Sequence, residues 1–215
     1  ARLTTRRQLE TLLQIAPDVW SERIGIGPLD VRIAPNQIPA LKRSGIPYEV
    51  LIPDVQALID RNRQGPLNPA GTWYDDYKPY GDVMDRLDLL AQMRPDLAQT
   101  FDIGLSLEGR LIRGIRLGDP DPARPSVVFQ SCQHAREWIS VMTTMYLAEA
   151  LINGDGVDDT ITALLDQVVV YIIPIVNPDG YEYSWTDNRL WRKNRRDNGN
   201  GTMGVDLNRN WSFGW

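Results

Sequence analysis

Residues 126–138 read Ser-Val-Val-Phe-Gln-Ser-Cys-Gln-His-Ala-Arg-Glu-Trp, an apolar run that gives way to a polar loop. The run at 126–131 has the length of a buried strand, and the apolar spacing of 138–152 predicts a helix. A strand followed by a loop and a helix is the repeating unit of α/β proteins. In such folds ligand sites lie where strands end, so the polar loop between these two elements is predicted to carry functional residues.

The same kind of pattern extends in both directions along the chain. Downstream, the sequence predicts a short helix at 160–166 and a second apolar strand at 167–176. Upstream, 80–93 predicts an amphipathic helix, and 100–117 predicts two strands around Glu108-Gly109. Together these elements predict an α/β domain with a mostly parallel or mixed sheet covered by helices.

The first 64 residues show a more compact alternation of short elements. We expect helices at 6–15, 36–44 and 54–63, and strands at 2–4, 19–24, 29–33 and 48–52. Two helices on one face of an antiparallel sheet form a ferredoxin-like arrangement, here with a shortened first strand. The Pro/Gly/Asn-rich residues 65–71 predict a linker, so we expect two domains, 1–64 and 72–215.

Composition restricts the classes of partner. The 215 residues are 42% hydrophobic and 24% charged, which is ordinary for a globular protein. The formal net charge of -5 argues against a nucleic-acid partner. No apolar run approaches the roughly 20 residues that span a bilayer, so no membrane partner is expected. The single cysteine, Cys132, leaves the redox compartment open.

His134 and Glu137 are the first candidate site residues. They lie three positions apart, so one helical turn can direct both side chains to the same point. Imidazole and carboxylate groups are good zinc ligands. A His and a Glu at this spacing also occur by chance, so the pair alone leaves a structural role open.

Further motifs follow in the chain: Asn177-Pro-Asp-Gly180, Asn188-Arg-Leu-Trp-Arg-Lys-Asn194 and Gly204-Val-Asp-Leu-Asn-Arg-Asn-Trp211. In their order and spacing, these motifs and the His134–Glu137 segment resemble the zinc carboxypeptidase family of the pancreatic A and B type. The resemblance covers residues 72–215, and residues 1–64 resemble the pro-domain that covers the active site in that family's zymogens. It implies an open-sandwich pro-domain followed by part of an α/β/α domain with a mixed sheet.

The resemblance implies a zinc site. His134 and Glu137 match two of the family's zinc ligands. Asp206 matches the carboxylate that accepts a hydrogen bond from the ligand imidazole and fixes its tautomer. The family's third ligand is a second histidine, and this chain contains one histidine only. The family's glutamate that activates the zinc-bound water is also missing, so we expect a further C-terminal part of the same protein to complete the site.

The resemblance also implies substrate contacts. Arg192 matches the arginine that stabilises the oxyanion during attack by water. Asn208 and Arg209 match the pair that holds the C-terminal carboxylate of the substrate. Arg136 and Arg189 match accessory positions along the cleft. The basic cluster around Arg192 could instead form a nucleic-acid patch, but it lies in an acidic region, and we expect Arg195 and Arg196 to be surface residues.

The implied activity is zinc-dependent hydrolysis of the C-terminal residue of peptides and proteins, by an enzyme made as a zymogen. We expect activation by cleavage between Arg61 and Gly71, and a secreted or extracellular protein whose leader has been removed. Two alternatives stay open. The chain could be an inactive fragment or a degenerate binding member of the family, or it could be a zinc amidase that acts on cell-wall peptides.

Overall fold

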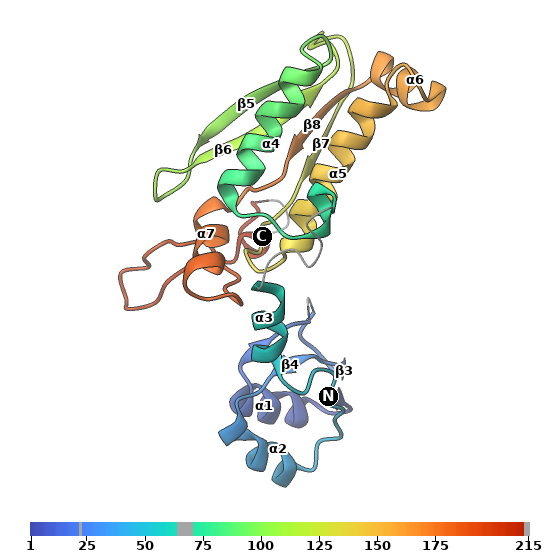
Figure 1. Cartoon of the computed structure of the whole chain (residues 1–215). Helices are drawn as coiled ribbons and strands as arrows, with labels where there is room; N and C mark the ends of the chain where they lie inside the picture. Colours follow the sequence, from blue (N-terminus) through green and yellow to red (C-terminus); the bar gives the residue numbers. More distant parts are fainter. Residues whose placement is uncertain (22, 64–70, 213–215) are drawn as a thin grey trace. The chain divides into compact units, whose positions relative to one another are not determined.

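The chain forms two units, Ala1–Arg61 and Asn62–Trp215, in a computed structural model that describes residues 1–21, 23–63 and 71–212 (Figure 1). Each unit has its own set of buried apolar side chains. Except for Gly71, the predicted linker at 65–71 lies outside the described residues.

The first unit contains short elements. They are β1 (Arg2–Leu3), α1 (Arg6–Ile15), β2 (Asp18–Val19), β3 (Gly27–Pro28), β4 (Val31–Arg32), the 3-10 turn η1 (Pro35–Gln37), α2 (Ile38–Ser44) and α3 (Val55–Arg63), whose last two residues belong to the second unit. The predicted helices at 6–15, 36–44 and 54–63 are confirmed. Leu12 and Leu29 are fully buried in the core of this unit.

Local hydrogen bonds explain why these helices begin and end where the sequence predicts. The Thr5 hydroxyl accepts a hydrogen bond from the Gln8 backbone N–H at 3.2 Å, and the Gln8 side chain accepts one from the Thr5 N–H at 3.3 Å. At α3, the Asp54 carboxylate accepts from the Ala57 N–H at 3.0 Å. Gly45 ends α2 with a left-handed φ of 68°, which glycine adopts without steric cost.

The strands of this unit are shorter than predicted. β1 pairs with β3 and β2 pairs with β4, both antiparallel, so the expected sheet is present as two separate two-residue ladders. The predictions of 19–24 and 29–33 as full strands are therefore wrong in length. An apolar run forms a strand only where a neighbouring backbone offers hydrogen bonds, and Ile24 and Ile26 remain 58% and 63% exposed.

The predicted strand at 48–52 is absent from the described residues. Val50 and Leu51 are 62% and 64% exposed. The nearest backbone link is the hydrogen bond from the Arg2 N–H to the Pro47 carbonyl at 3.1 Å. β1 has only two residues, so it offers too short an edge to hold a further strand.

The second unit contains the mixed sheet. Its elements are the 3-10 turn η2 (Trp73–Asp75), α4 (Tyr80–Met93), β5 (Ala98–Leu105), β6 (Leu111–Leu117), β7 (Ser126–Gln130), α5 (Trp138–Gly154), α6 (Asp159–Gln167), β8 (Val169–Ile173), α7 (Pro178–Thr186) and the 3-10 turn η3 (Leu207–Arg209). The strand order is β5-β6-β8-β7. β5, β6 and β8 are antiparallel neighbours, and β7 runs parallel to β8. The predicted α/β class with a mixed sheet is confirmed.

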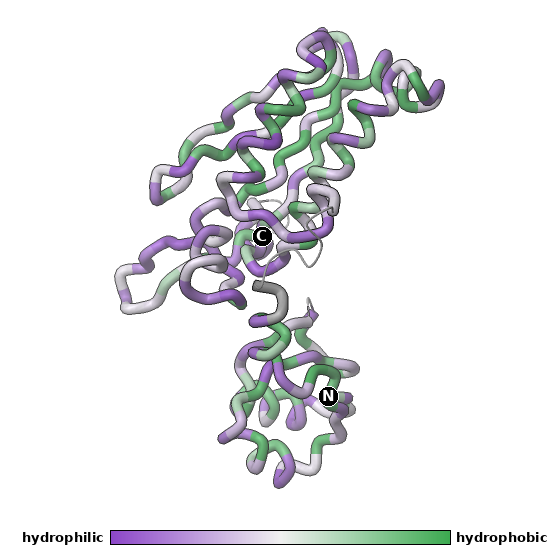
Figure 2. Tube along the Cα trace, viewed as in Figure 1, coloured by the Kyte–Doolittle hydropathy of each residue, from purple (hydrophilic) through white to green (hydrophobic). Residues whose placement is uncertain are grey.

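Helices α4 and α5 cover the sheet and supply much of the core (Figure 1). Leu87 of α4, Ile115 of β6, Met145 of α5 and Ile172 of β8 are all 0% exposed and belong to one cluster. Figure 2 shows hydrophobic residues running along these strands and helices. Among the described residues, no helix is both long and apolar enough to cross a membrane.

β7 differs from its prediction as a buried strand. All five of its residues are exposed, with Val128 at 58% and Phe129 at 41%. In the described sheet β7 is the last strand, so it pairs with β8 along one edge and has no strand along the other. Apolar composition identifies a strand, but it does not tell whether the strand lies at the centre or the edge of a sheet.

Candidate active site

The loop between β7 and α5 begins with a strained turn. Ladder hydrogen bonds continue one residue past β7, where the Ser131 N–H donates to the Ile173 carbonyl at 3.0 Å. Cys132 then takes a φ of 57°, and within the described part of the chain it is the only residue other than glycine with a positive φ. Such a conformation costs roughly 1–2 kcal/mol. The buried turn redirects the chain from the strand towards His134.

His134 lies between two carboxylates. Its side chain is buried, with the residue 3% exposed. Nδ1 lies 2.9 Å from Oε1 of Glu137, and Nε2 lies 3.1 Å from Oδ1 of Asp206. The structure thus brings together three residues that the sequence analysis selected, although Asp206 is 72 positions away in the chain.

Arg192 joins the same group. Its Nε donates to Oδ2 of Asp206 at 3.1 Å, and its Nη1 lies 3.7 Å from Oε1 of Glu137. Asp206 also accepts from the Asn208 backbone N–H at 3.0 Å. Burial opposes the charged form of Asp206, but the hydrogen bond and charge of Arg192 outweigh it, and His134 adds to this effect. The pKa of Asp206 is therefore below its usual value, and the carboxylate stays ionised.

The donor set of this group fits zinc. Asp206 accepts a hydrogen bond at Nε2 of His134, which leaves Nδ1 as the ring nitrogen for a metal. That nitrogen and the Glu137 oxygen face each other, and imidazole and carboxylate are both zinc ligands. Over residues 1–21, 23–63 and 71–212, no group of three or more His, Cys, Asp or Glu residues could hold a metal. Within the described residues, His134 and Glu137 are thus a pair of donors of the types that zinc binds.

Asn177 ties the two loops of the site together, and the sequence analysis did not assign it a role. It is 3% exposed, and its Nδ2 donates to the Gln133 carbonyl at 3.0 Å and to the Lys193 carbonyl at 3.1 Å. Gln133 precedes His134, and Lys193 follows Arg192. The Ala135 N–H donates to the Arg192 carbonyl at 3.0 Å and makes a second link between the loops. The position of Asn177 at the end of an apolar strand was the available signal.

Two of the predicted accessory arginines contact each other. Nη1 of Arg189 donates to the Arg136 carbonyl at 2.8 Å. The guanidinium of Arg189 lies 3.5 Å from the ring centroid of Trp138, which is a close cation–π contact. Arg136 belongs to the loop that carries His134, and Arg189 therefore lies beside this loop.

Asn208 and Arg209 lie in η3, directly after Asp206. Both residues are exposed, and Nη1 of Arg209 donates to the Asn208 carbonyl at 2.8 Å. Their position next to Asp206 brings them into the same part of the molecule as His134.

The prediction that Arg195 is a surface residue is wrong. Its side chain is 17% exposed, and its guanidinium lies 3.7 Å from the ring centroid of Tyr183 and 4.9 Å from that of Trp191. Nε also lies 3.6 Å from Oε1 of Glu108. Arg196 is exposed, as predicted.

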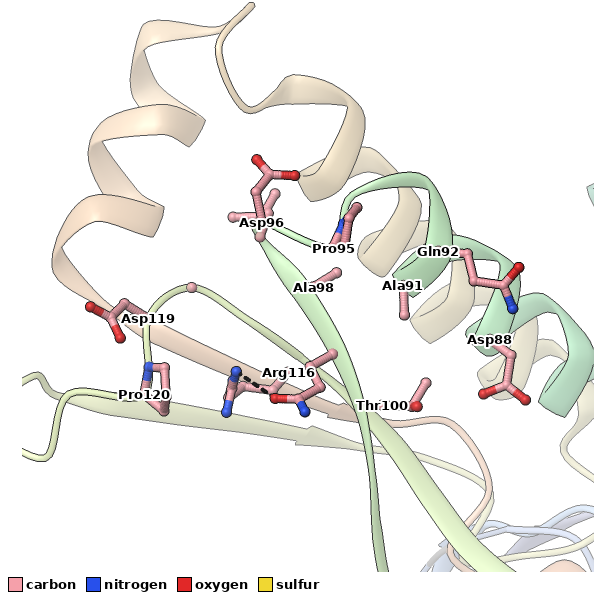
Figure 3. A pocket seen from close by; sticks show the side chains of 13 residues that line it. Asp88, Ala91, Gln92, Pro95, Asp96, Ala98, Thr100, Arg116, Asp119 and Pro120 are labelled. Atoms are coloured by element: carbon pink, nitrogen blue, oxygen red, sulfur yellow. Dashed lines mark hydrogen bonds between the residues drawn. The ribbon is translucent and has the colours of Figure 1, made fainter.

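A separate open pocket lies at the other end of the sheet (Figure 3). It is lined by the end of α4, the start of β5 and the turn at 118–120, and Arg116 there donates to the Gln99 side chain at 2.9 Å. Leu117 pairs with Val170 near the start of β8, whereas the His134 site lies past the end of β8. The pocket is therefore not part of the candidate site.

Taken together, these observations define a mixed α/β protein that carries a separate N-terminal unit. Residues 83–215 match the sequence model described as zinc carboxypeptidase, and residues 1–62 match the one described as carboxypeptidase activation peptide. The chain belongs to the zinc carboxypeptidase family. This result confirms the resemblance and the fold class that the sequence predicted.

Relatives match the whole chain. It is 32% identical to carboxypeptidase A1 of Rattus norvegicus over 100% of this chain and 54% of the relative. It is also 32% identical to the inactive metallocarboxypeptidase ECM14 of Ajellomyces capsulatus, over 100% of this chain and 41% of the relative. The chain thus spans about half the length of the curated relatives it matches.

Solved structures agree with this assignment. The crystal structure of thrombin activatable fibrinolysis inhibitor superposes with a TM-score of 0.85 at 27% identity, over 99% of this chain and 57% of that chain. Carboxypeptidase A from Helicoverpa armigera superposes with a TM-score of 0.80 at 28% identity, over 100% of this chain and 57% of that chain. The relatives include carboxypeptidases and an inactive protein, so family membership alone does not decide activity.

Proposed function

We propose that this chain is the N-terminal part of a zymogen of a zinc metallocarboxypeptidase, which removes the C-terminal residue of peptides and proteins. One observation carries the proposal. Nδ1 of the buried His134 and Oε1 of Glu137 meet at 2.9 Å, with Asp206 behind the ring at Nε2. This is the arrangement that a metal-binding histidine with an orienting carboxylate requires.

His134 and Glu137 would hold the zinc ion, with the remaining ligand from a C-terminal part of the same protein. When bound, zinc supplies a water of lowered pKa and polarises the scissile carbonyl. Asp206 holds the imidazole in one tautomer and orientation. Because Arg192 keeps Asp206 ionised, this support persists across the neutral pH range.

Arg192 would stabilise the negative charge that develops on the scissile carbonyl oxygen, because a fixed guanidinium in a partly buried site favours an oxyanion. Asn208 and Arg209 would bind the free carboxylate of the substrate, since a planar guanidinium can form two charge-assisted hydrogen bonds with it. Arg136 and Arg189 would contact the peptide further along the cleft. Selection of a free carboxylate makes the reaction an exopeptidase reaction.

The N-terminal unit would act as the activation peptide, which leaves the protein by cleavage between Arg61 and Gly71. Residues 64–70 of this segment lie outside the described residues. We also propose that the protein acts outside the cell, with free peptide C-termini as its partners and neither nucleic acid nor membrane among them.

The first test is Glu137→Gln in the full-length protein, meaning this chain together with its C-terminal part. A neutral amide is a poorer zinc ligand than a carboxylate. We expect bound zinc, measured by elemental analysis after dialysis, to fall at least about tenfold, which corresponds to about 1.4 kcal/mol. Peptidase activity should fall with it, and a chelator should abolish the remainder.

Glu182→Gln is the matched control. Glu182 lies in α7, and its side chain makes no hydrogen bond or ion pair among the described residues, so zinc content and activity should be unchanged. Retention of full zinc content and turnover by Glu137→Gln would contradict the metal assignment.

Arg209→Ala tests the choice of substrate. Loss of a charge-assisted contact costs roughly 1.5–3 kcal/mol, so we expect kcat/KM on peptides with a free C-terminus to fall by about tenfold or more. The same peptides with an amidated C-terminus should show no such difference between the two proteins. An unchanged rate on free C-termini would remove the proposed carboxylate contact.

A non-catalytic role is the principal alternative, and the match to an inactive metallocarboxypeptidase favours considering it. A full-length protein that binds no zinc and releases no C-terminal residues would establish this alternative. The second alternative, a zinc amidase, predicts zinc binding together with release of cell-wall peptides and no dependence on Arg209.

A further inference from the structure

The hairpin at Asp197-Asn-Gly-Asn-Gly-Thr-Met203 contains two Asn-Gly steps. Asp197 and Met203 form an antiparallel bridge, and all the residues between them are exposed. Gly199 and Gly201 have positive φ values of 71° and 81°, which explains why glycine occupies both positions. The proposed activity uses none of these residues.

An Asn-Gly step is open to attack by its own backbone. Glycine has no Cβ, so nothing shields its amide nitrogen from the carbonyl carbon Cγ of the preceding asparagine. Two identical dipeptides in one exposed hairpin would react alike if sequence alone determined reactivity. The hydrogen bonds around the two asparagines are, however, different.

Asn198 is held in a way that opposes the reaction. Its Nδ2, the leaving group, donates to Oγ1 of Thr202 at 3.1 Å and to the Gly204 carbonyl at 3.3 Å. The nucleophile is also engaged, because the Gly199 N–H donates to Oδ1 of Asp197 at 2.8 Å. Reaction at Asn198 therefore requires that these hydrogen bonds break first.

Asn200 is held in the opposite sense. Its Oδ1 accepts hydrogen bonds from the Thr202 N–H at 3.1 Å and the Thr202 hydroxyl at 2.6 Å. These donors withdraw electron density from Cγ and stabilise negative charge that develops on Oδ1, as an oxyanion hole does. Among the described residues, Nδ2 of Asn200 and the N–H of Gly201 have no hydrogen-bond acceptor, so leaving group and nucleophile face solvent.

We propose that Asn200 is a site of spontaneous deamidation and that Asn198, two residues earlier, is protected by the fold. The Gly201 amide loses its proton to water, and its nitrogen forms a bond to Cγ of Asn200. The Cγ–Nδ2 bond breaks, and Nδ2 leaves with an added proton as ammonia. Water then opens the resulting succinimide at either carbonyl and yields aspartate or isoaspartate. The sum is one water consumed and one ammonia released.

The products differ in their effect on the hairpin. Aspartate at position 200 keeps an acceptor for Thr202 and makes the formal net charge of -5 more negative by one. Isoaspartate inserts an extra carbon into the main chain, so the short path between Asn200 and Thr202 changes. The protein should therefore accumulate acidic variants that differ only in this hairpin.

The test is incubation of the full-length folded protein at mildly alkaline pH, followed by digestion and fragment-ion mass spectrometry. Cleavage after Arg196 and Arg209 releases one peptide that contains both asparagines. We expect Asn200 to convert at least about tenfold faster than Asn198, a difference of about 1.4 kcal/mol in activation free energy. Asn200→Gln should remove the rapid phase.

Two controls isolate the role of the structure. In concentrated denaturant the two Asn-Gly steps should convert at similar rates, because their hydrogen bonds are lost. Thr202→Val removes the hydroxyl that both anchors Nδ2 of Asn198 and activates Asn200, so the ratio of the two rates should fall towards one. Equal or faster conversion of Asn198 in the folded protein would overturn the proposal, as would a ratio that Thr202→Val leaves unchanged.

Discussion

At the scale of single residues, the side chain of Asn177 shows why an amide and not a carboxylate occupies this position. Its Nδ2 donates to the carbonyls of Gln133 and Lys193, and its Oδ1 accepts from the Gly180 N–H at 3.1 Å. Only a group that carries both donors and an acceptor can make all three hydrogen bonds. Asn177 is thus a positioning residue for the loops that carry His134 and Arg192.

Asn177→Asp tests this role. The carboxylate cannot donate, so the Gln133 and Lys193 carbonyls lose their partner and face a negative charge. We expect the free energy of unfolding to fall by about 1–3 kcal/mol and kcat to fall more than KM changes, because the loops lose their relative position. Urea denaturation and steady-state kinetics on the full-length protein measure the two effects.

Asn188→Asp is the control for this substitution. Asn188 is exposed, and its Oδ1 accepts from the Leu190 N–H at 3.1 Å, a bond that a carboxylate can keep. Its stability and kinetics should match the wild type. Equal behaviour of the two variants would show that Asn177 does not position the loops.

At the scale of elements, α7 and the segment after Arg192 approach each other closely at Gly180. A Cβ at this position would lie 2.5 Å from the Lys193 carbonyl oxygen and 2.7 Å from the Asn177 side chain. Helix α7 can therefore lie against this segment only if residue 180 has no side chain. The Asn-Pro-Asp-Gly sequence follows β8 and starts α7, and its last residue permits this packing.

Gly180→Ala should destabilise the second unit by about 1–3 kcal/mol, because the backbone has to move to accommodate the methyl group. Gly81→Ala is the matched control, since Gly81 lies in helix α4 and no atom lies within 4 Å of its added Cβ. That variant should be neutral or more stable, by up to about 1 kcal/mol, because alanine has the higher helix propensity. Thermal or urea denaturation compares the two, and an unchanged Gly180→Ala protein would contradict the proposed approach.

At the scale of the whole molecule, the chain has two separate cores. Leu12 belongs to the core of the first unit and Leu87 to the core of the second, and both are 0% exposed. Each core buries its own helices and strands, so the two units have separate sources of stability.

Leu12→Ala and Leu87→Ala form a reciprocal pair of tests. Each substitution should cost about 2–5 kcal/mol in its own unit, because it removes buried methyl groups and leaves a cavity. We expect amide hydrogen exchange to accelerate within residues 1–61 for Leu12→Ala and within the second unit for Leu87→Ala. Faster exchange in both units from either substitution would show that the cores are not separate.

Interactions between residues close together in the sequence were predictable. Thr5, Gly45 and Asp54 define helix ends through contacts within a few positions, so the helices of the first unit agree with prediction. The strands were less predictable, because pairing depends on a partner elsewhere in the chain. The run at 48–52 has the composition of a strand but finds no sufficient edge. β7 has the composition of a central strand but lies at the edge of the sheet that the described residues form.

The candidate site likewise combines features that the sequence predicted with contacts that only the folded structure shows. The amino-acid sequence by itself placed His134 and Glu137 three positions apart, and its ordered motifs indicated the family. The helical turn expected for this pair is absent, because α5 begins at Trp138; a loop turn, in which the Glu137 N–H donates to the His134 carbonyl at 3.1 Å, holds the two residues instead. The resemblance implied a contact between Asp206 and the imidazole, and the structure places it at Nε2 of His134. Only the tertiary structure decided that Asn177 joins two loops and that Arg195 packs against two aromatic rings. The physical reason is range: caps and turns act over a few bonds, whereas these contacts form only when distant segments pack against each other.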